Sequence, residues 1–497
     1  MTVDFLTAAD FYRYLQCPHW PYWERFGDKK LKRHISAMEE MCQADGLEHE
    51  RQIVKKYFGA MREVKAASGE EGFKKTLTLM QEGAPLIYQG WLMDGDWRGR
   101  PDILERREGK SAFGNWYYVP LDIKRAHEIK KEHMAQLTFY ALLLERIQKR
   151  FPAEPAIVNG DGDRMPFQAE TFLSEFERLR ENIERIRDGE IPDPVYRKSC
   201  VDKSPWSDAC FNLAYEKNDI ALLFNVDVRK LASLRSLGIR TIDDAADIDP
   251  EALEGQAPGL TLRGLRRVQQ QAKSLRGERV IIHKTFTDKH EGLEIHFDIE
   301  SHPPTDTDYL YGFWMGGHIP TNHPYYISFV AEKITDEKKM WKAFLKWLPT
   351  LPASYTVYHY ASYESARLTV LARRYGDEGN PWLEKFKSRM IDLKEETREH
   401  VVLPLYFYSL KKICKFLGFD WKGDVQGGGE SVVAFEKWRK TKKRAILNSI
   451  LQYNEEDVRA TAFLLNWLRH YAMKEKEFSK PYPWSSPMLH GDSVEPS

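Results

Sequence analysis

Two acidic residues stand one residue apart in the segment HFDIESHPPT, residues 296–305, just before a proline-rich stop. Successive side chains of a strand alternate between its two faces, so Asp298 and Glu300 would point the same way. Like charges side by side repel and strands disfavour Asp, so the pattern predicts a cation, most simply a divalent metal ion, between the two carboxylates. The alternative is an exposed strand end that carries two solvated acids.

Further acidic residues follow where helices are expected. Glu364 lies near the start of the helix predicted within TVYHYASYESARLTVL (356–371). In LQYNEEDVRATAFLLNWL (451–468), Tyr453 and Asp457 are four residues apart and therefore share one helix face. Hard divalent cations take several carboxylate oxygens from different elements, and two such ions can drive the hydrolysis of a phosphodiester bond at neutral pH.

This order of motifs resembles the DEDD exonucleases of the RNase H-like superfamily, over about residues 290–475. The resemblance implies a mixed sheet with helices on both sides, Tyr453 as the residue that orients the attacking water, and two Mg²⁺ or Mn²⁺ ions held by Asp298, Glu300, Glu364 and Asp457. Family members usually have Asp where this chain has Glu364, which reaches one methylene further. Tyr453 could also be a packed aromatic residue. Asp392, at the head of another expected helix, is either a further ligand or an acid that suits the helix dipole.

A second group of polar residues occupies the N-terminal part of the chain. Within PLDIK (120–124), Asp122 and Lys124 would share one face of a strand, and Asp102 precedes them in GRPDIL (99–104). As an isolated pattern, an acid beside a lysine indicates a plain ion pair. The pair is not isolated, however, because a histidine lies upstream and a Gln-x-x-x-Tyr motif lies downstream; these residues are His49, Gln136 and Tyr140.

Along the chain these four motifs are the histidine, Asp102, Asp-x-Lys and Gln-x-x-x-Tyr. In this order they resemble the PD-(D/E)XK nucleases of the RecB type, over about residues 1–215. The resemblance implies that His49, Asp102 and Asp122 bind a divalent metal ion. It also implies that Lys124 stabilises the pentacoordinate phosphate or positions the water. Gln136 and Tyr140 would then support the site and contact the DNA backbone.

Some relatives of this type close the domain with an iron–sulfur cluster held by four cysteines. Here Cys17, Cys200 and Cys210 stand in matching places, but Ser204 stands where the middle thiolate is expected. Serine is a poor ligand for such a cluster. We therefore expect the iron–sulfur site to be degraded or lost.

Between the two nuclease-like regions, residues 216–280 contain short helices broken by glycine. SLGIRTIDD (236–244) and PGLTLRGLRR (258–267) are typical of helix–hairpin–helix elements, whose backbone N–H groups suit a phosphate. A small helical spacer with glycine turns is the equally good alternative. The segment LRGLRRVQQQAKSLRGER (262–279) is also locally basic.

Composition narrows the class of protein without identifying a partner. The 497 residues contain 74 Lys and Arg and 74 Asp and Glu, so net charge gives no hint of a polyanionic partner. No apolar run is long enough for a membrane helix and the N-terminus lacks the pattern of a signal peptide, so we expect a cytoplasmic protein without a membrane partner. Five cysteines are too few for a disulfide framework.

The sequence thus predicts a multi-domain α/β protein with two nuclease sites. The expected domains are a restriction-endonuclease-like PD-(D/E)XK domain (1–215), a helix–hairpin–helix linker (216–280), an RNase H-like exonuclease domain (281–475) and a flexible tail (476–497). We expect metal-dependent hydrolysis of nucleic acid, with DNA favoured; the partner would be single-stranded DNA or RNA, or duplex ends. The alternatives are one active site only, a dead nucleic-acid-binding scaffold in a repair or defence complex, or a phosphatase acting on small phosphates.

Overall fold

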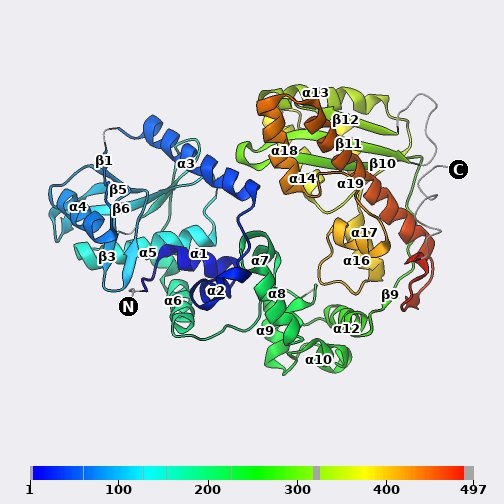
Figure 1. The fold of residues 1–497 in the computed structure, drawn as a ribbon, viewed down its shortest axis with the longest axis horizontal. Helices are drawn as coiled ribbons and strands as arrows, with labels where there is room; N and C mark the ends of the chain where they lie inside the picture. The colour runs from blue at the N-terminus through cyan, green and yellow to red at the C-terminus, as the bar shows by residue number, and fades with distance from the viewer. Residues whose placement is uncertain are drawn as a thin grey trace. The chain divides into compact units, whose positions relative to one another are not determined.

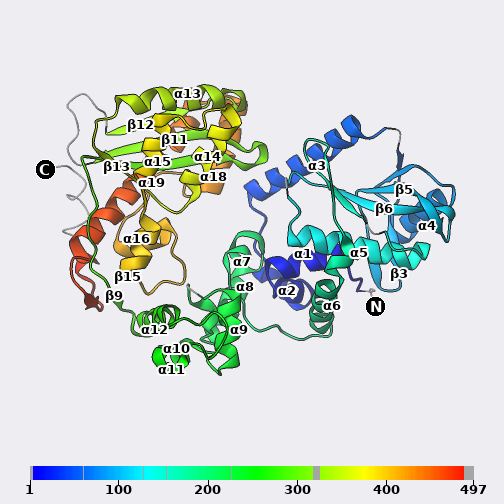
Figure 2. The same ribbon diagram turned by 180° about the vertical axis from the view of Figure 1, so that it is seen from behind.

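The computed structural model describes residues 4–59, 61–126, 128–152, 154–224, 226–316 and 325–485. The chain forms two compact units, which we call unit 1 (residues 1–35 with 43–217) and unit 2 (36–42 with 218–497). Both are mixed α/β, as Figures 1 and 2 show. The middle segment that we expected as a separate linker domain is part of unit 2.

Unit 1 is built on a mixed six-stranded sheet. The strand order is β1-β2-β5-β6-β7-β8, with β1–β2 and β6–β7 parallel and the other pairs antiparallel. The strands are β1 (Arg62–Glu63), β2 (Leu86–Tyr88), β5 (Ile103–Ser111), β6 (Gly114–Ile123), β7 (Ala156–Val158) and β8 (Arg164–Pro166). Unit 1 also contains the hairpin of β3 (Leu92–Asp94) and β4 (Trp97–Gly99), helix α4 (Gly69–Gln81), and helix α3 (Ala37–Tyr57) from residue 43 onward.

The side-chain amide of Gln148 holds helix α5 (Lys131–Gln148) against the sheet, because it pairs with the backbone of one residue as a neighbouring strand would. Gln148 is fully buried; its Oε1 accepts a hydrogen bond from Tyr118 N at 2.8 Å, and its Nε2 donates to Tyr118 O at 3.0 Å. Because Tyr118 lies on β6, this pair of bonds fixes the end of α5 to the strand that carries Asp122. The contact therefore sets the position of Gln136 and Tyr140 relative to that strand.

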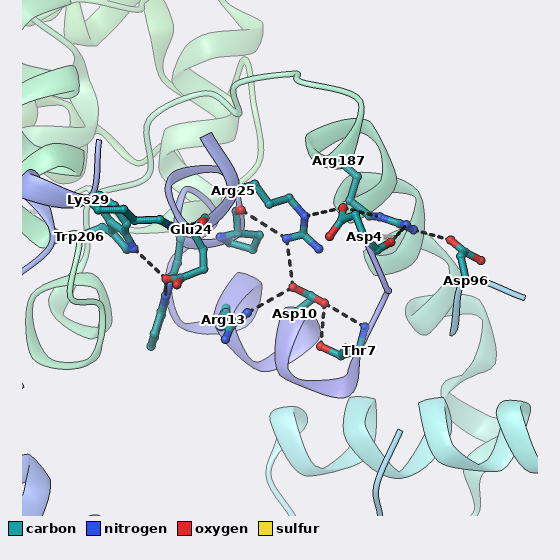
Figure 3. A network of polar contacts seen from close by, with 12 residues as sticks. Asp4, Thr7, Asp10, Arg13, Glu24, Arg25, Lys29, Asp96, Arg187 and Trp206 are labelled. Atoms are coloured by element: carbon teal, nitrogen blue, oxygen red, sulfur yellow. Dashed lines mark hydrogen bonds and ion pairs between the residues drawn. The ribbon is translucent and has the colours of Figure 1, made fainter. Parts of the chain in front are cut away.

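The two ends of unit 1 are joined by a network of polar contacts (Figure 3). Arg25 on α2 (Trp20–Phe26) contacts Asp4 at 3.0 Å and the buried Asp10 of α1 (Ala8–Gln16) at 3.1 Å. Arg187, at the end of α6 (Leu173–Arg187), binds Asp96 at 2.8 Å.

A second contact of the same network reaches the last helices of unit 1, α7 (Lys198–Lys203) and α8 (Ser207–Glu216). The fully buried Trp206, immediately before α8, donates its Nε1–H to Glu24 at 3.0 Å. The N-terminal helices are thus tied to the C-terminal helices of the unit (Figure 3).

Unit 2 begins with short helices separated by glycine turns, as the sequence indicates. They are α9 (Val228–Ser236), α10 (Ile242–Ala246), α11 (Pro250–Leu253) and α12 (Leu262–Gly277). Gly238 and Gly259 take the left-handed conformation with φ of 82° and 78°, which residues with a β-carbon adopt only with strain. Short helices joined by glycine turns are therefore present, while the helix–hairpin–helix motif and its role stay a prediction.

The larger sheet of unit 2 has the strand order β12-β11-β10-β13-β14. Strands β10–β11 and β11–β12 are antiparallel, whereas β10–β13 and β13–β14 are parallel. The strands are β10 (Leu293–His302), β11 (Thr307–Gly316), β12 (Tyr326–Val330), β13 (Tyr355–His359) and β14 (Met390–Asp392). The helices that follow are α13 (Glu337–Trp347), α14 (Tyr363–Tyr375), α15 (Pro381–Ser388), α16 (Leu393–His400), α17 (Leu410–Leu417), α18 (Gly428–Thr441) and α19 (Arg444–Tyr471).

Helices cover both faces of this sheet, and the alternation of β10 decides which residues meet which helix. Phe297 packs on one face with Phe344 of α13, their ring centroids 6.4 Å apart. Asp298, one residue later, points to the opposite face and meets α19, where it contacts Asn454. The long helix α19 therefore lies over the acidic face of β10 (Figure 1).

Unit 2 also contains a small three-stranded sheet, in the order β15-β9-β16. Its strands are β9 (Val280–Ile282), β15 (Val401–Val402) and β16 (Lys476–Phe478). We expected a flexible tail from residue 476, but β16 pairs with β9, and Tyr482 and Trp484 are buried in an aromatic cluster. Residues 476–485 are thus packed because they bury large aromatic rings; the rest of the expected tail, 486–497, lies outside the described residues.

Among the described residues, no helix combines the length and the apolar character needed to cross a membrane.

We expect Gln148→Leu to destabilise unit 1. The substitution leaves the N–H and C=O groups of Tyr118 buried without partners, which costs about 1–3 kcal/mol for each such group. The free energy of unfolding, measured with urea, should fall accordingly. Gln168→Leu is the control, because the Gln168 side chain is exposed and donates a hydrogen bond to Glu154 on the surface. Equal stability of the two variants would refute this role of Gln148.

Candidate active sites

Three carboxylates converge in unit 2. Asp298 and Glu300 of β10 and Asp457 of α19 each offer an oxygen, and these oxygens all lie within 4.8 Å of one another. Glu300 and Asp457 are buried and Asp298 is half-buried. Within the part of the chain that the structure describes, this is the one group of three or more His, Cys, Asp or Glu side chains so close together. The shared strand face expected for Asp298 and Glu300 is present.

Neutral hydrogen-bond donors from α19 and its neighbours orient two of these carboxylates. Asn454 Nδ2 donates to Asp298 Oδ2 at 2.8 Å, and Asn454 Oδ1 accepts from the hydroxyl of Tyr326 at 2.8 Å. Trp421 Nε1 donates to Asp457 Oδ1 at 2.6 Å. The sequence motifs singled out neither Asn454 nor Trp421.

Hydrogen bonds also reach Glu300, the remaining carboxylate of the trio, and link Tyr453 to Asp457. The buried hydroxyl of Tyr309 lies 3.3 Å from Glu300 Oε2 and 2.7 Å from Ser431 Oγ. Tyr453 is buried and donates a hydrogen bond to Asp457, four residues further along α19. Tyr453 therefore touches the carboxylate group and is also packed, so the two readings of this residue are compatible.

Burial and mutual repulsion make these acids reluctant to ionise. Burial raises the pKa of Asp298 well above its ordinary value, and the charges of Glu300 and Asp457 raise it further. Burial, then the charge of Asp457, raises the pKa of Glu300 to about 8. The pKa of Asp457 is also raised, mainly by burial. A cation among the three carboxylates would reverse these shifts.

Lys411 of α17 is a cation beside this group that sequence reasoning missed. Its Nζ lies 4.4 Å from the ring centroid of Tyr453, and it donates a hydrogen bond to Gln426 O. Burial lowers the pKa of Lys411 although Asp457 and Glu300 act in the opposite direction. The lysine thus moderates the negative charge without forming an ion pair with a carboxylate of the trio.

Glu364 and Asp392, the other acids of this region, lie outside the trio. Glu364 is buried at the start of α14, with its Oε2 3.3 Å from His359 Nδ1. Its charge contributes to the raised pKa of Asp298. Asp392 caps α16 by accepting hydrogen bonds from Lys394 N at 2.9 Å and from Ala361 N at 2.8 Å. Asp392 therefore acts as the helix N-terminal acid that was one of our two expectations.

In unit 1, Asp102, Asp122 and Lys124 come together at the ends of two neighbouring strands. Lys124 Nζ lies 2.7 Å from Asp122 Oδ2 and 4.0 Å from Asp102 Oδ2. Asp102 Oδ2 accepts a hydrogen bond from Ile123 N at 2.8 Å. Burial and the charge of Asp122 raise the pKa of Asp102, whereas the lysine charge lowers it. The ammonium group occupies the space beside both carboxylates.

Helix α5 brings Gln136 and Tyr140 together, as the four-residue spacing predicts. Gln136 Nε2 donates to the hydroxyl of Tyr140 at 3.2 Å, and that hydroxyl donates to Arg100 O at 3.4 Å. Burial, then the charge of Asp122, raises the pKa of Tyr140, so Tyr140 lies close to the acids of unit 1.

Helix α3 carries His49 and also Glu50, a residue that the sequence motifs did not single out. His49 Nε2 is buried and lacks a hydrogen-bond partner among the described residues. Glu50, its neighbour, accepts hydrogen bonds from Tyr88 at 2.8 Å and from Gln89 at 2.7 Å. Gln89 also lies 3.3 Å from Asp102 Oδ1, so one amide links Glu50 to that aspartate.

The three cysteines singled out from the sequence belong to one buried cluster of unit 1. Cys17 Sγ and Cys210 Sγ are 3.4 Å apart, and Cys200 forms a hydrogen bond with Cys17. The hydrogen bond with Cys17, then burial, raises the pKa of the Cys200 thiol. Ser204 is buried, and its Oγ accepts a hydrogen bond from Trp206 N at 3.1 Å. This set of donors lacks the fourth thiolate that an iron–sulfur cluster needs.

Comparison with known families assigns the C-terminal part of the chain. Residues 295–469 match the model of the RNase H superfamily. The matched segment contains the trio of unit 2 together with Glu364 and Tyr453, so the chain has a C-terminal RNase H-like domain. No curated protein matches the chain. The resemblance of residues 1–215 to RecB-type nucleases stays a prediction.

Gly312 of β11 has no side chain, and the side chain of Asn454 fills the space beside it. A β-carbon at Gly312, which pairs with Asp298 in the sheet, would lie 1.5 Å from Asn454 Oδ1. Gly312→Ala should therefore lower the free energy of unfolding by about 1–3 kcal/mol through overpacking. Urea unfolding would measure the change, with Gly428→Ala as control because a β-carbon there meets no atom within 4 Å.

A double-mutant cycle separates this clash from a general loss of stability. In the Asn454→Ala background the clashing oxygen is absent, so Gly312→Ala should cost much less there. Equal costs in both backgrounds would show that Asn454 is not the group that Gly312 accommodates.

Proposed function

We propose that the protein is a metal-dependent nuclease whose RNase H-like domain hydrolyses phosphodiester bonds of nucleic acid. The observation that carries the proposal is the trio Asp298, Glu300 and Asp457, close together and mutually repelling, within the segment that matches the RNase H superfamily. A phosphatase acting on small phosphates would use similar carboxylates, but the family match favours a nucleic-acid substrate. DNA remains the favoured form.

The residues of the trio fit Mg²⁺ or Mn²⁺. Hard divalent cations take carboxylate oxygens, and the three oxygens are close enough to share one ion. When bound, such ions make water a better nucleophile at neutral pH and stabilise the charge on the leaving oxygen. Burial, and then repulsion among the carboxylates, raises the pKa values of Asp298 and Glu300, so the protein alone does not neutralise these acids.

In this proposal the surrounding side chains position the reacting groups. Asn454 and Trp421 hold the carboxylates of Asp298 and Asp457 in fixed orientations. The Tyr453 hydroxyl, beside Asp457, orients the attacking water. Lys411 contributes a positive charge close to the negatively charged phosphate. Glu364 would serve as the ligand of a second ion.

Unit 1 is proposed to hold a second, RecB-like nuclease site. The support is the grouping of Asp102, Asp122 and Lys124, with Gln136 and Tyr140 nearby. His49 has an unpartnered Nε2 that can serve as a metal ligand. Lys124, once a metal ion neutralises the acids, would be free to contact the phosphate.

Asp298→Asn should abolish the cleavage assigned to unit 2. Removing one charge from the trio weakens metal binding and transition-state stabilisation, so we expect cleavage of 5′-labelled single-stranded DNA and RNA to fall by at least about a hundredfold. Mn²⁺ should also raise the melting temperature of wild type but not that of Asp298→Asn. Glu384→Gln, an exposed acid of the same unit, is the control. Unchanged cleavage and unchanged metal stabilisation would refute the site.

Lys124→Ala should remove a cleavage pattern different from the one lost in Asp298→Asn. If both sites act, the double variant loses all metal-dependent cleavage, with EDTA as the reference for background. The exposed Lys110 gives the matched control, Lys110→Ala. If Lys124→Ala retains every wild-type product, only the RNase H-like site cuts. If wild type binds both strands but cuts neither in Mg²⁺ or Mn²⁺, the protein is a nucleic-acid-binding scaffold.

A further inference from the structure

A hollow rich in basic side chains lies on unit 2, lined by residues of α12, of the segment after β9 and of the end of α16. We call it the arginine hollow. The ionisable residues that line it are Arg263, Arg266, Arg267, His283, Lys284 and Glu399. None of these residues belongs to the carboxylate trio or to the groups proposed to act with it.

Three cations of the arginine hollow share one carboxylate. Arg263 Nη2 and Arg267 Nη2 lie 2.6 Å and 2.7 Å from Glu399 Oε2, and Lys284 Nζ lies 3.1 Å from Glu399 Oε1. Burial raises the pKa of Glu399, but Lys284 and the two arginines lower it more, so the carboxylate stays ionised. One negative charge cannot neutralise three positive ones, which leaves the hollow with excess positive charge.

The backbone around the arginine hollow is firmly held. The buried Gln271 of α12 donates to Leu403 O and to Leu405 O, both at 3.1 Å. His283 N donates to His400 O at 3.1 Å, next to the pairing of β9 with β15. The cations are therefore carried by elements that do not need to move toward one another when a ligand binds.

We propose that the arginine hollow is a docking site for the phosphate backbone of a nucleic-acid strand, an inference that rests on the proposed nuclease function. A phosphodiester offers two oxygens and a negative charge, as Glu399 does, and arginine binds both groups through paired N–H donors. The phosphates of a strand in the hollow would pair with the positive charges that Glu399 leaves unneutralised.

The proposed contacts use side chains rather than the backbone amides expected from the hairpin motif. Thr261 Oγ1 accepts from Gly264 N at 3.2 Å, and Glu254 Oε1 accepts from Leu262 N at 3.3 Å. These amides at the start of α12 are therefore occupied within the protein. The arginine and lysine side chains remain as the groups able to hold a phosphate.

Fluorescence anisotropy with fluorescein-labelled single-stranded DNA, in EDTA to prevent cleavage, tests the inference. The triple variant Arg263→Ala/Arg267→Ala/Lys284→Ala should bind at least about tenfold more weakly, and the slope of log K against log salt should fall by about two. Glu399→Gln should bind more tightly, because it removes a competitor for the cations. Arg276→Ala is the matched control: Arg276 lies on the same helix and pairs with Asp247 at 2.7 Å.

A small substrate separates this inference from the proposed nuclease function. Thymidine 5′-p-nitrophenyl phosphate has no strand to occupy the hollow, so the triple variant should turn it over like wild type, whereas Asp298→Asn should not. Wild-type DNA affinity and salt dependence in the triple variant would overturn the docking site. So would weaker binding by Glu399→Gln. If wild type hydrolyses the small substrate but does not bind DNA, the docking site fails while the hydrolase survives.

Discussion

Repulsion among three closely spaced carboxylates is the constraint around which unit 2 is organised. Asp298, Glu300 and Asp457 offer oxygens within 4.8 Å of one another, where an uncompensated negative charge is costly. The side chains that hydrogen-bond them are neutral donors, and the nearby ammonium of Lys411 donates to a backbone carbonyl instead. The protein therefore orients the acids without neutralising them, which is what a site for divalent cations requires.

Unit 1 meets the same repulsion in a different way. There Lys124 forms an ion pair with Asp122 at 2.7 Å and also faces Asp102. A divalent ion entering this site must compete with a resident ammonium group, while one entering unit 2 need displace no such group from the trio. On electrostatic grounds, the proposed RecB-like site should thus require a higher metal concentration than the RNase H-like site.

Sequence periodicity predicted the relations within one element but not those between elements. The two-residue period placed Asp298 and Glu300 on one face, and the four-residue spacing aligned Gln136 with Tyr140. Lys411 and Trp421 carry no such signal, because each reaches the site from a segment far from β10 in the sequence. Glu50 adjoins a residue we selected, yet only the folded sheet shows its link to Asp102 through Gln89. The packed segment 476–485 was missed because its proline and serine content concealed its buried aromatic rings.

Glu364 decides how many ions the proposed site of unit 2 can hold. The trio provides oxygens close enough for one ion, and a second ion needs a further carboxylate. Glu364 faces Asp298 closely enough to raise its pKa, but its own carboxylate is hydrogen-bonded to His359. The additional methylene of Glu, relative to Asp, adds a rotatable bond through which the carboxylate can turn from the histidine toward the trio. Under the proposed function, occupation of the second position would be a competition between His359 and the ion for one carboxylate, and the second ion would then be the weaker one.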